Sequence, residues 1–275
     1  MDYPFELVGK IGSMALIRKE DQEIDYNIIS RLGADLKPGM IWVTSGATEI
    51  GRLDYIKRTG RELNGDPEQD KTDYSSQGQA ILMQNYRQFI RPEYGVRQIL
   101  VEHTHFNDAE KREHIRQLFE RAARQKTIPI VNYNDPVSDE ENRKMELAAR
   151  REKGGEVHEC VDNDETAAVI ANLVHAKMLV IMTSTEGIYQ KYGDPDTLVR
   201  DVTGNSIEEV EKQVRALQEN CIGASRAGAN GARAKLEYAL SCVRGGTTVI
   251  IGHARHHLSD LAEGRVPCTR IGVGL

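Results

Sequence analysis

Short apolar runs alternate with longer segments of helical period along most of the chain. The runs at residues 41–44, 128–132 and 178–182 are typical of strands that are buried on both faces of a parallel sheet. Between two such runs, residues 115–122 place apolar side chains at the i, i+3, i+4 and i+7 positions of one helix face. The alternation predicts an α/β fold with a mostly parallel sheet covered by helices on both sides.

Local signals predict where several helices begin. Ser206 and Glu209 have the spacing of a capping box and predict a helix that starts beside them. Asp162 and Asp164 precede an apolar helical segment, and helix capping alone is one explanation of these two carboxylates. Residues 64–73 and 138–156 are rich in charge, and we expect solvated loops or exposed helix there.

Composition excludes several classes of protein. The 275 residues include 42 acidic and 36 basic residues, a net charge of −6 without a long basic run, so we expect no nucleic-acid partner. No apolar run approaches the roughly 20 residues that span a bilayer, and the N-terminus lacks the hydrophobic region of a signal peptide. We therefore expect a cytoplasmic protein without a membrane partner. Its four cysteines are widely scattered, which predicts reduced structural thiols.

Small polar residues and glycines follow several of the predicted strands. In a parallel sheet, ligands bind beyond the carboxyl ends of the strands, and glycines let backbone N–H groups approach a phosphate. A further glycine-containing loop, residues 228–235, ends in a lysine near a predicted helix start. This arrangement is suited to binding an anion at the helix N-terminus. Each segment alone is also compatible with an ordinary loop. The segments that follow the strands are Gly9–Ser13, Ser45–Ala47, Asn132–Asp135 and Thr183–Gly187.

The order of these motifs resembles the amino acid kinase family and, within it, most closely the glutamate 5-kinases. The similarity extends from about Phe5 to Gly252. It is more specific for the superfamily than for the substrate. The matching motifs are Val8–Ser13, Val43–Ala47, Gly78–Tyr86, Ile128–Asp135, Asp162–Asp164 and Gly187–Tyr189.

The resemblance implies one amino acid kinase domain over residues 1–275, built as a three-layer αβα sandwich. Its acceptor-binding part would cover about residues 1–172 and its nucleotide-binding part about residues 173–275. The implied activity is ATP-dependent and Mg²⁺-dependent phosphorylation of the side-chain carboxylate of L-glutamate to an acyl phosphate, the entry step of proline biosynthesis. Family members commonly form dimers or tetramers, so we expect a homo-oligomer that takes a small amino-acid substrate.

The resemblance also implies roles for individual residues. Lys10 and Lys235 would stabilise charge on the transferring phosphoryl group, and Asp164 would orient the two lysines. This agrees with the physics of phosphoryl transfer, in which most of the catalysis comes from positioning the reactants and from cations that stabilise the charge of the transferring group. A carboxylate acceptor needs no general base, because its pKa in solution is about 4.3. The implied acceptor-binding residues are Ser45, Gly46, Ala47, Asp135 and Asn163. The implied nucleotide-binding residues are Gly12, Ser13, Thr183, Ser184, Gly187, Tyr189, Gly228, Gly231 and Arg233.

Some positions depart from the family pattern. Tyr133 replaces an acidic residue of the acceptor motif, Ser184 replaces an aspartate on the nucleotide side, and residues 138–156 are in excess of the family pattern. The chain also ends at Leu275 without the additional C-terminal domain of many glutamate 5-kinases. Two alternatives therefore remain open. One is a kinase of the same fold with another acceptor, such as another amino acid, carbamate or a nucleoside monophosphate. The other is a non-catalytic nucleotide-binding regulatory protein, against which the retained Lys10, Asp164 and Lys235 argue.

Two groups of histidines raise the question of a metal site. His103 and His105 would lie on one side of a predicted strand, and the others follow the last predicted strand at His253, His256 and His257. No carboxylate or cysteine at a convincing spacing completes either group, so we predict no metal ligands among them.

Overall fold

The computed structural model describes residues 4–18, 20–138, 140–152, 154, 157–160, 162–191, 194–220 and 231–275. Contacts divide the chain into two compact units. Unit 1 comprises residues 1–11, 39–43 and 164–275, and unit 2 comprises residues 12–38 and 44–163. The strands are β1 (Phe5–Ile11), β2 (Met40–Thr44), β3 (Gly95–Val101), β4 (Thr127–Tyr133), β5 (Ala176–Thr183), β6 (Asp201–Gly204), β7 (Thr248–His253) and β8 (Cys268–Val273).

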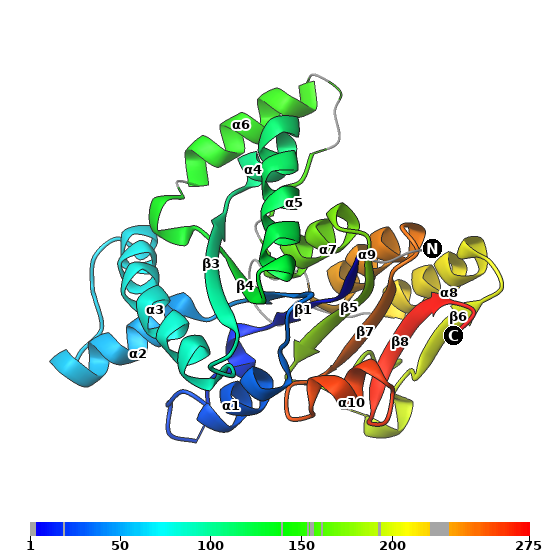
Figure 1. Cartoon of the computed structure of the whole chain (residues 1–275), viewed down its shortest axis with the longest axis horizontal. Coiled ribbons are helices and arrows are strands. Elements are labelled where there is room, and N and C mark those ends of the chain that lie inside the picture. Colours follow the sequence, from blue (N-terminus) through cyan, green and yellow to red (C-terminus); the bar gives the residue numbers. More distant parts are fainter. Residues whose placement is uncertain are drawn as a thin grey trace. The chain divides into compact units, whose positions relative to one another are not determined.

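Helices separate most of these strands along the chain (Figure 1). Among the described residues, no helix is both long and apolar enough to cross a membrane. The α-helices are α1 (Tyr26–Asp35), α2 (Ala47–Thr59), α3 (Pro67–Phe89), α4 (His103–Asn107), α5 (Ala109–Arg124), α6 (Glu140–Glu152), α7 (Asn163–Leu173), α8 (Ile207–Asn220), α9 (Gly231–Arg244) and α10 (Leu258–Ala262). Short 3-10 helices are η1 (Ser13–Ala15), η2 (Asp135–Val137) and η3 (Pro195–Thr197).

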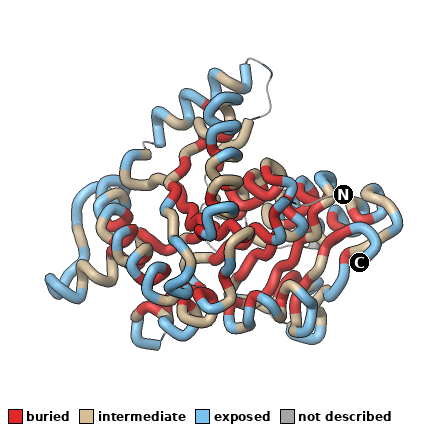
Figure 2. The backbone as a smooth tube through the Cα atoms, viewed as in Figure 1, coloured by how far each residue is buried: buried red, intermediate tan, exposed pale blue. Residues whose placement is uncertain are grey.

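Unit 1 is built on a sheet with the strand order β2-β1-β5-β7-β8-β6. Strands β1, β5 and β7 pair in parallel, whereas β8 runs antiparallel to β7 and parallel to β6. The central strands are buried along most of their length (Figure 2), which is why their sequences read as continuous apolar runs. Trp42 of β2 is fully buried, as its apolar surroundings in the sequence predict.

Helices cover both faces of the unit 1 sheet. On one face α9 packs between α8 and α7, and Asn172 of α7 donates a hydrogen bond to Ser241 of α9. Helix α10 lies on the other face (Figure 1). There the side chain of Leu261 packs against Gly252 of β7. This arrangement confirms the predicted α/β class, with a mostly parallel sheet between two layers of helices.

Unit 2 contains the parallel pair β3 and β4, with α5 packed against β4 and α3 against both α1 and α2. Helices α2 and α3 cross at unusually short range. A Cβ atom added to Gly78 would lie 1.8 Å from the main-chain oxygen of Ala47, and one added to Gly51 would lie 1.8 Å from that of Tyr74. Only glycine fits at these two positions, so the Gly78 motif found in the sequence has a packing role.

Most predicted elements are confirmed, but several boundaries differ. β1 continues to Ile11, so Gly9 and Lys10 lie inside the strand instead of in the turn after it, because their backbone keeps pairing with β5. β4 likewise includes Asn132 and Tyr133. The segment 64–73 is not all loop, because the Asp66 side chain caps α3, which starts at Pro67.

Other parts of the sequence analysis need similar corrections. His103 and His105 belong to helix α4, so the strand expected there was wrong. Residues 140–152 form helix α6, which is one of the two structures expected for that segment. Strands β6 and β8 were not predicted, because β6 has only four residues and the apolar residues of β8 are interrupted by Thr269, Arg270 and Gly272. The helix after Ser206 is confirmed, and the Ser206 hydroxyl accepts a hydrogen bond from the Glu209 backbone N–H.

Candidate active site

Three residues predicted to handle the phosphoryl group meet in unit 1. The Nζ atom of Lys10, in β1, lies 2.5 Å from Oδ1 of Asp164, and Nζ of Lys235, in α9, lies 2.8 Å from Oδ2 of the same carboxylate. The Asp164 side chain is 1% exposed and that of Lys10 8%, whereas that of Lys235 is 24% exposed. One buried carboxylate therefore holds two ammonium groups.

The net charge of the cluster formed by Lys10, Asp164 and Lys235 favours the binding of an anion. Two ammonium groups face one carboxylate, which leaves an excess of one positive charge. Burial would by itself raise the pKa of Asp164, but the charges of Lys10 and Lys235 and their hydrogen bonds outweigh burial and hold that pKa below its usual value. Asp164 is thus ionised at neutral pH and orients both lysines. The arrangement suits stabilisation of additional negative charge.

The predicted acceptor-binding residues Ser45 and Asn163 contact each other within unit 2. The Asn163 Nδ2 group donates to the Ser45 hydroxyl at 3.0 Å, to the Thr44 carbonyl at 3.1 Å and to Oδ1 of Asn132 at 3.1 Å. Nδ2 of Asn132 in turn donates to Oε1 of Gln79 at 2.9 Å. These hydrogen bonds join the end of β2, the end of β4 and the first residue of α7.

Two buried polar atoms in this group have no hydrogen-bond partner among the described residues. They are Oδ1 of Asn163, an acceptor, and Nε2 of Gln79, a donor. Buried polar groups are nearly always hydrogen-bonded in folded proteins, and exceptions need an explanation such as a bound ligand or water. An unused donor and acceptor in one group of polar side chains fit the binding of a small polar molecule.

Gly46 and Ala47 lie where α2 begins. Gly46 is the N-cap residue of the helix and has a φ of 103°, a left-handed conformation that L side chains rarely adopt. Ala47 is the first residue of the helix and is buried. The sharp turn at Gly46 brings the helix start close behind Ser45.

Asp135 lies in η2 after β4, where Lys71 of α3 contacts it. The Lys71 Nζ atom is 3.1 Å from Oδ1 of Asp135, and the two side chains are 58% and 23% exposed. The structure thus does not place Asp135 in the hydrogen-bonded group of Ser45 and Asn163. It gives Asp135 a cationic partner of its own within unit 2.

The predicted nucleotide-binding residues after β5 form a turn in unit 1. The Thr183 hydroxyl accepts a hydrogen bond from the Thr185 backbone, Ser184 is exposed, and Gly187 is buried beside Thr269. Tyr189 forms a β-bridge with Leu198. These contacts hold a compact turn at the carboxyl end of β5.

Glu186, within the same turn, was not predicted to have a role. Its carboxylate lies 2.7 Å from Nε2 of His256 and forms an ion pair with Arg255, both of which follow β7. The carboxylate therefore ties the turn after β5 to the turn after β7. His253 and His256 lie with ring centroids 6.5 Å apart.

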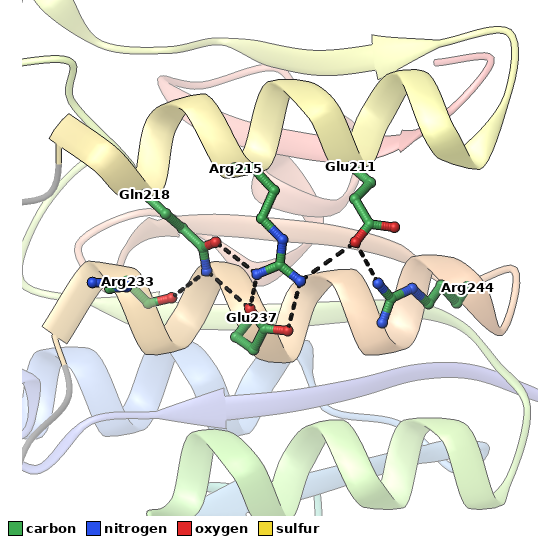
Figure 3. Close-up of polar contacts among 6 residues, drawn as sticks. All are labelled: Glu211, Arg215, Gln218, Arg233, Glu237 and Arg244. Carbon is green, nitrogen blue, oxygen red and sulfur yellow. Dashed lines mark hydrogen bonds and ion pairs between the residues drawn. The ribbon is translucent and has the colours of Figure 1, made fainter.

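Gly231 and Arg233 lie in the first turn of α9, close in sequence to Lys235. Gln218 of α8 donates from Nε2 to the main-chain oxygen of Arg233 at 3.0 Å and to Glu237 at 3.1 Å (Figure 3). Arg215 of α8 also forms an ion pair with Glu237. Polar contacts from α8 thus hold the turn that carries Lys235. Gly228 lies outside the described residues.

Gly12 and Ser13 lie in unit 2, where Gly12 is the N-cap residue of η1 and Ser13 its first residue. Neither histidine group forms a metal site in the described part of the chain, because no cluster of three or more His, Cys, Asp or Glu residues is placed to hold an ion. His103 instead lies 2.8 Å from Glu146 of α6.

Sequence reasoning gave no role to Asn132, Gln79 and Lys71. Asn132 and Gln79 lay inside the recognised motifs but were not singled out. Lys71 precedes Gly78 by seven residues, a spacing that returns to the same face of a helix. Extending the helical period of α3 back from Gly78 would have found it.

Comparisons with known proteins identify the family. Residues 7–253 match the model of the amino acid kinase family. "Glutamate 5-kinase 2" of Bacillus subtilis is 29% identical over 94% of this chain and 66% of its own length. A glutamate 5-kinase of Herpetosiphon aurantiacus is 30% identical over 98% of this chain and 68% of its own length. The chain spans about two thirds of the length of such relatives, 62% to 66% for the first three.

Solved structures share the fold at much lower identity. Carbamate kinase from Giardia lamblia bound to AMP-PNP superposes with a TM-score of 0.60 at 12% identity, covering 98% of this chain and 99% of that one. Isopentenyl phosphate kinase from T. acidophilum gives a TM-score of 0.56 at 13% identity, with 98% and 99% covered. The family match over most of the chain and the shared fold lead to one conclusion: this chain belongs to the amino acid kinase family.

Proposed function

We propose that the chain is an ATP-dependent kinase that phosphorylates the side-chain carboxylate of L-glutamate to an acyl phosphate. The observation that carries this proposal is the buried contact of Asp164 with both Lys10 and Lys235. Phosphoryl transfer needs cations held ready around the transferring group, and this cluster holds two. The relatives named glutamate 5-kinase support the choice of acceptor.

The proposed acceptor-binding residues lie in unit 2, and so do Gly12 and Ser13, whereas the other described residues proposed to bind the nucleotide lie in unit 1. In this proposal unit 1 binds the nucleotide through the turn after β5 and the first turn of α9. Unit 2 binds the acceptor through Ser45, Asn163 and Asp135. Asn163 and Asp164 are consecutive residues at the start of α7, so one helix start carries an acceptor-binding amide and the carboxylate that orients the lysines.

Each residue then has a defined task. The Ser45 hydroxyl donates a hydrogen bond to the acceptor carboxylate, and the unpartnered Oδ1 of Asn163 accepts one from a donor group of the acceptor, such as its ammonium. The carboxylate is already ionised, so it attacks the γ-phosphorus of ATP without a general base, and the bond to ADP breaks as the acyl phosphate forms. Lys10 and Lys235 stabilise negative charge on the phosphoryl oxygens. Asp164 keeps both ammonium groups in place. The residues fit a polyphosphate, since their net charge is positive. Magnesium carried by the nucleotide would neutralise further phosphate charge.

A second candidate is a kinase of the same fold that uses another acceptor. Tyr133 favours it, because this buried side chain stands where the family has an acidic residue and its hydroxyl accepts a hydrogen bond from Ser138 at 3.2 Å. Ser138 leads into α6, which lies in the segment that exceeds the family pattern. A changed contact there would alter the acceptor pocket.

Acceptor-dependent ADP release tests the proposal. The purified protein is given ATP and Mg²⁺ with L-glutamate, L-aspartate, N-acetylglutamate, carbamate or UMP, and hydroxylamine traps any acyl phosphate as a hydroxamate. Release that depends on L-glutamate, with hydroxamate formed, is the expected result. Turnover of another acceptor only would select the second candidate. Nucleotide binding without any turnover would favour the non-catalytic alternative.

A further inference from the structure

A cavity of about 310 Å³ lies in unit 2, beside the first turns of α3 and α6 and next to η2. Charged and polar side chains from all three elements line it. Asp135 is among them, so the cavity adjoins a residue that we propose contacts the acceptor. The lining side chains that carry the argument are Glu68, Lys71, Asp135, Ser138, Glu140 and Arg143.

The carboxylates in this lining already have partners from the protein. Lys71 contacts Oδ1 of Asp135 at 3.1 Å. Lys144 contacts Glu140 at 2.5 Å, and Oε1 of Glu68 accepts a hydrogen bond from the Glu140 backbone N–H at 3.1 Å. Each of these three carboxylates in the cavity lining therefore already has at least one partner within the chain.

Arg143 is different. Its side chain is half-buried, and it forms no hydrogen bond or ion pair with any other residue in the described ranges. A guanidinium group presents five donors in a rigid fork that matches a carboxylate bidentately. A half-buried arginine without a hydrogen-bond or ion-pair partner among the described residues, in a cavity where the protein already contacts each of these carboxylates, is arranged for an anionic group from outside the chain. The Lys71 contact uses Oδ1 of Asp135, so Oδ2 of that carboxylate can still accept a hydrogen bond from a bound molecule.

An α-amino acid carries an ammonium and a carboxylate on the same carbon atom, and Asp135 and Arg143 line the same cavity. We propose that Arg143 is a specificity-determining residue that binds the α-carboxylate of the acceptor, while Asp135 accepts a hydrogen bond from its α-ammonium. This inference rests on the proposed function. It adds a role for residues 138–156, the segment that exceeds the family pattern and contains α6. Through Arg143, this segment would select α-amino acids over acceptors that lack an α-carboxylate.

4-Aminobutyrate is the probe for this role, because it is glutamate without the α-carboxylate and keeps both the ammonium and the distal carboxylate. The experiment measures kcat/KM for L-glutamate and the inhibition constant of 4-aminobutyrate against glutamate turnover. The variants are Arg143→Gln and Arg143→Lys. Arg124→Gln is the matched control, because it makes the same substitution at an exposed arginine at the end of α5, which does not line the cavity.

The expected result is a loss of about 10- to 100-fold in kcat/KM for L-glutamate in Arg143→Gln, as for a lost hydrogen bond to a charged group. The inhibition constant of 4-aminobutyrate should stay within about twofold, because that ligand makes no contact through an α-carboxylate. Arg143→Lys should recover part of the loss, since it keeps the charge but not the fork. Arg124→Gln should resemble the wild type on both ligands.

Equal losses on both ligands in Arg143→Gln, or no loss on glutamate, would overturn the inference. If the wild type does not phosphorylate glutamate, the proposed function fails, and calorimetric binding of the same two ligands then decides the inference separately. Glutamate binding that Arg143→Gln weakens selectively would support it. Absence of glutamate binding to the wild type would overturn it. Melting curves for every variant show that the fold is kept.

Discussion

The ammonium of Lys10 lies 2.5 Å from the carboxylate of Asp164, and both side chains are almost fully buried. A buried ion pair gains little stability over apolar packing, because both charges lose their hydration. A gain in stability therefore does not account for this ion pair, which is consistent with the role proposed for the two residues in phosphoryl transfer. Lys10 is the next-to-last residue of strand β1, where its backbone pairs with β5, so its ammonium extends from a fixed position.

We predict that Lys10→Ala lowers kcat by at least about 100-fold and leaves KM for the acceptor within a few-fold, because an interaction made mainly in the transition state is lost. Steady-state ADP release checks this. Lys177→Ala, which removes an exposed lysine from the neighbouring strand β5, is the matched control and should behave as the wild type. An unchanged kcat in Lys10→Ala would remove the proposed role of this lysine.

Asp164→Asn should reduce the free energy of unfolding at pH 7 by about 3–5 kcal/mol, because buried Lys10 then lacks its counter-charge. The pKa of Asp164 lies below its usual value, so its ionised form stabilises the fold above about pH 4 and this contribution is lost as the pH falls further. Urea unfolding at several pH values should show the difference between wild type and variant shrinking below pH 4. A difference that is constant with pH would contradict the assignment.

Asn163→Ala should raise KM for the acceptor by about tenfold, the cost of losing a hydrogen-bonding amide at a polar site. Ser45→Ala should act in the same direction, because Ser45 and Asn163 contact each other. Acceptor titrations at saturating ATP measure both. Ser76→Ala, an exposed position on α3, is the control. Unchanged acceptor KM in both site variants would move the acceptor away from this group of residues.

Gly78→Ala should destabilise unit 2 by about 2 kcal/mol or more. The added methyl would overlap the main-chain oxygen of Ala47, so α2 and α3 would have to separate. Thermal or urea unfolding measures the loss. The exposed neighbour Gln84→Ala lies on the same helix and should leave stability nearly unchanged. Equal stability of the two variants would show that the helices can move apart at little cost.

The thiol of Cys242 should resist alkylation in the folded protein. Burial raises the pKa of this thiol to about 12, so almost no thiolate exists at pH 8. Mass spectrometry after iodoacetamide treatment should find Cys242 labelled in urea but not in buffer. Rapid labelling of the native protein would show that α9 opens easily from α7, where the Cys242 sulfur contacts the Ala168 carbonyl.

The elements that follow from local sequence were predictable. The apolar runs became strands, and the Ser206 and Glu209 pair marked a helix start, because both signals depend on residues a few positions apart. The order of the small polar motifs identified the superfamily for the same reason. Each motif is a local turn or strand end whose residues can be read directly.

The alternation of apolar runs and helical segments thus determined the fold class, and the motif residues determined which side chains to inspect. The family resemblance implied that Asp164 orients Lys10 and Lys235, and the tertiary structure added the distances and the burial of that cluster. The tertiary structure alone decided that Lys10 lies inside β1 and that Lys71 is the partner of Asp135. It also decided that Arg143 lines a cavity with Asp135. These relationships join residues far apart in the chain. They depend on strand register and helix packing, which arise from many distant contacts and leave no local pattern in the sequence.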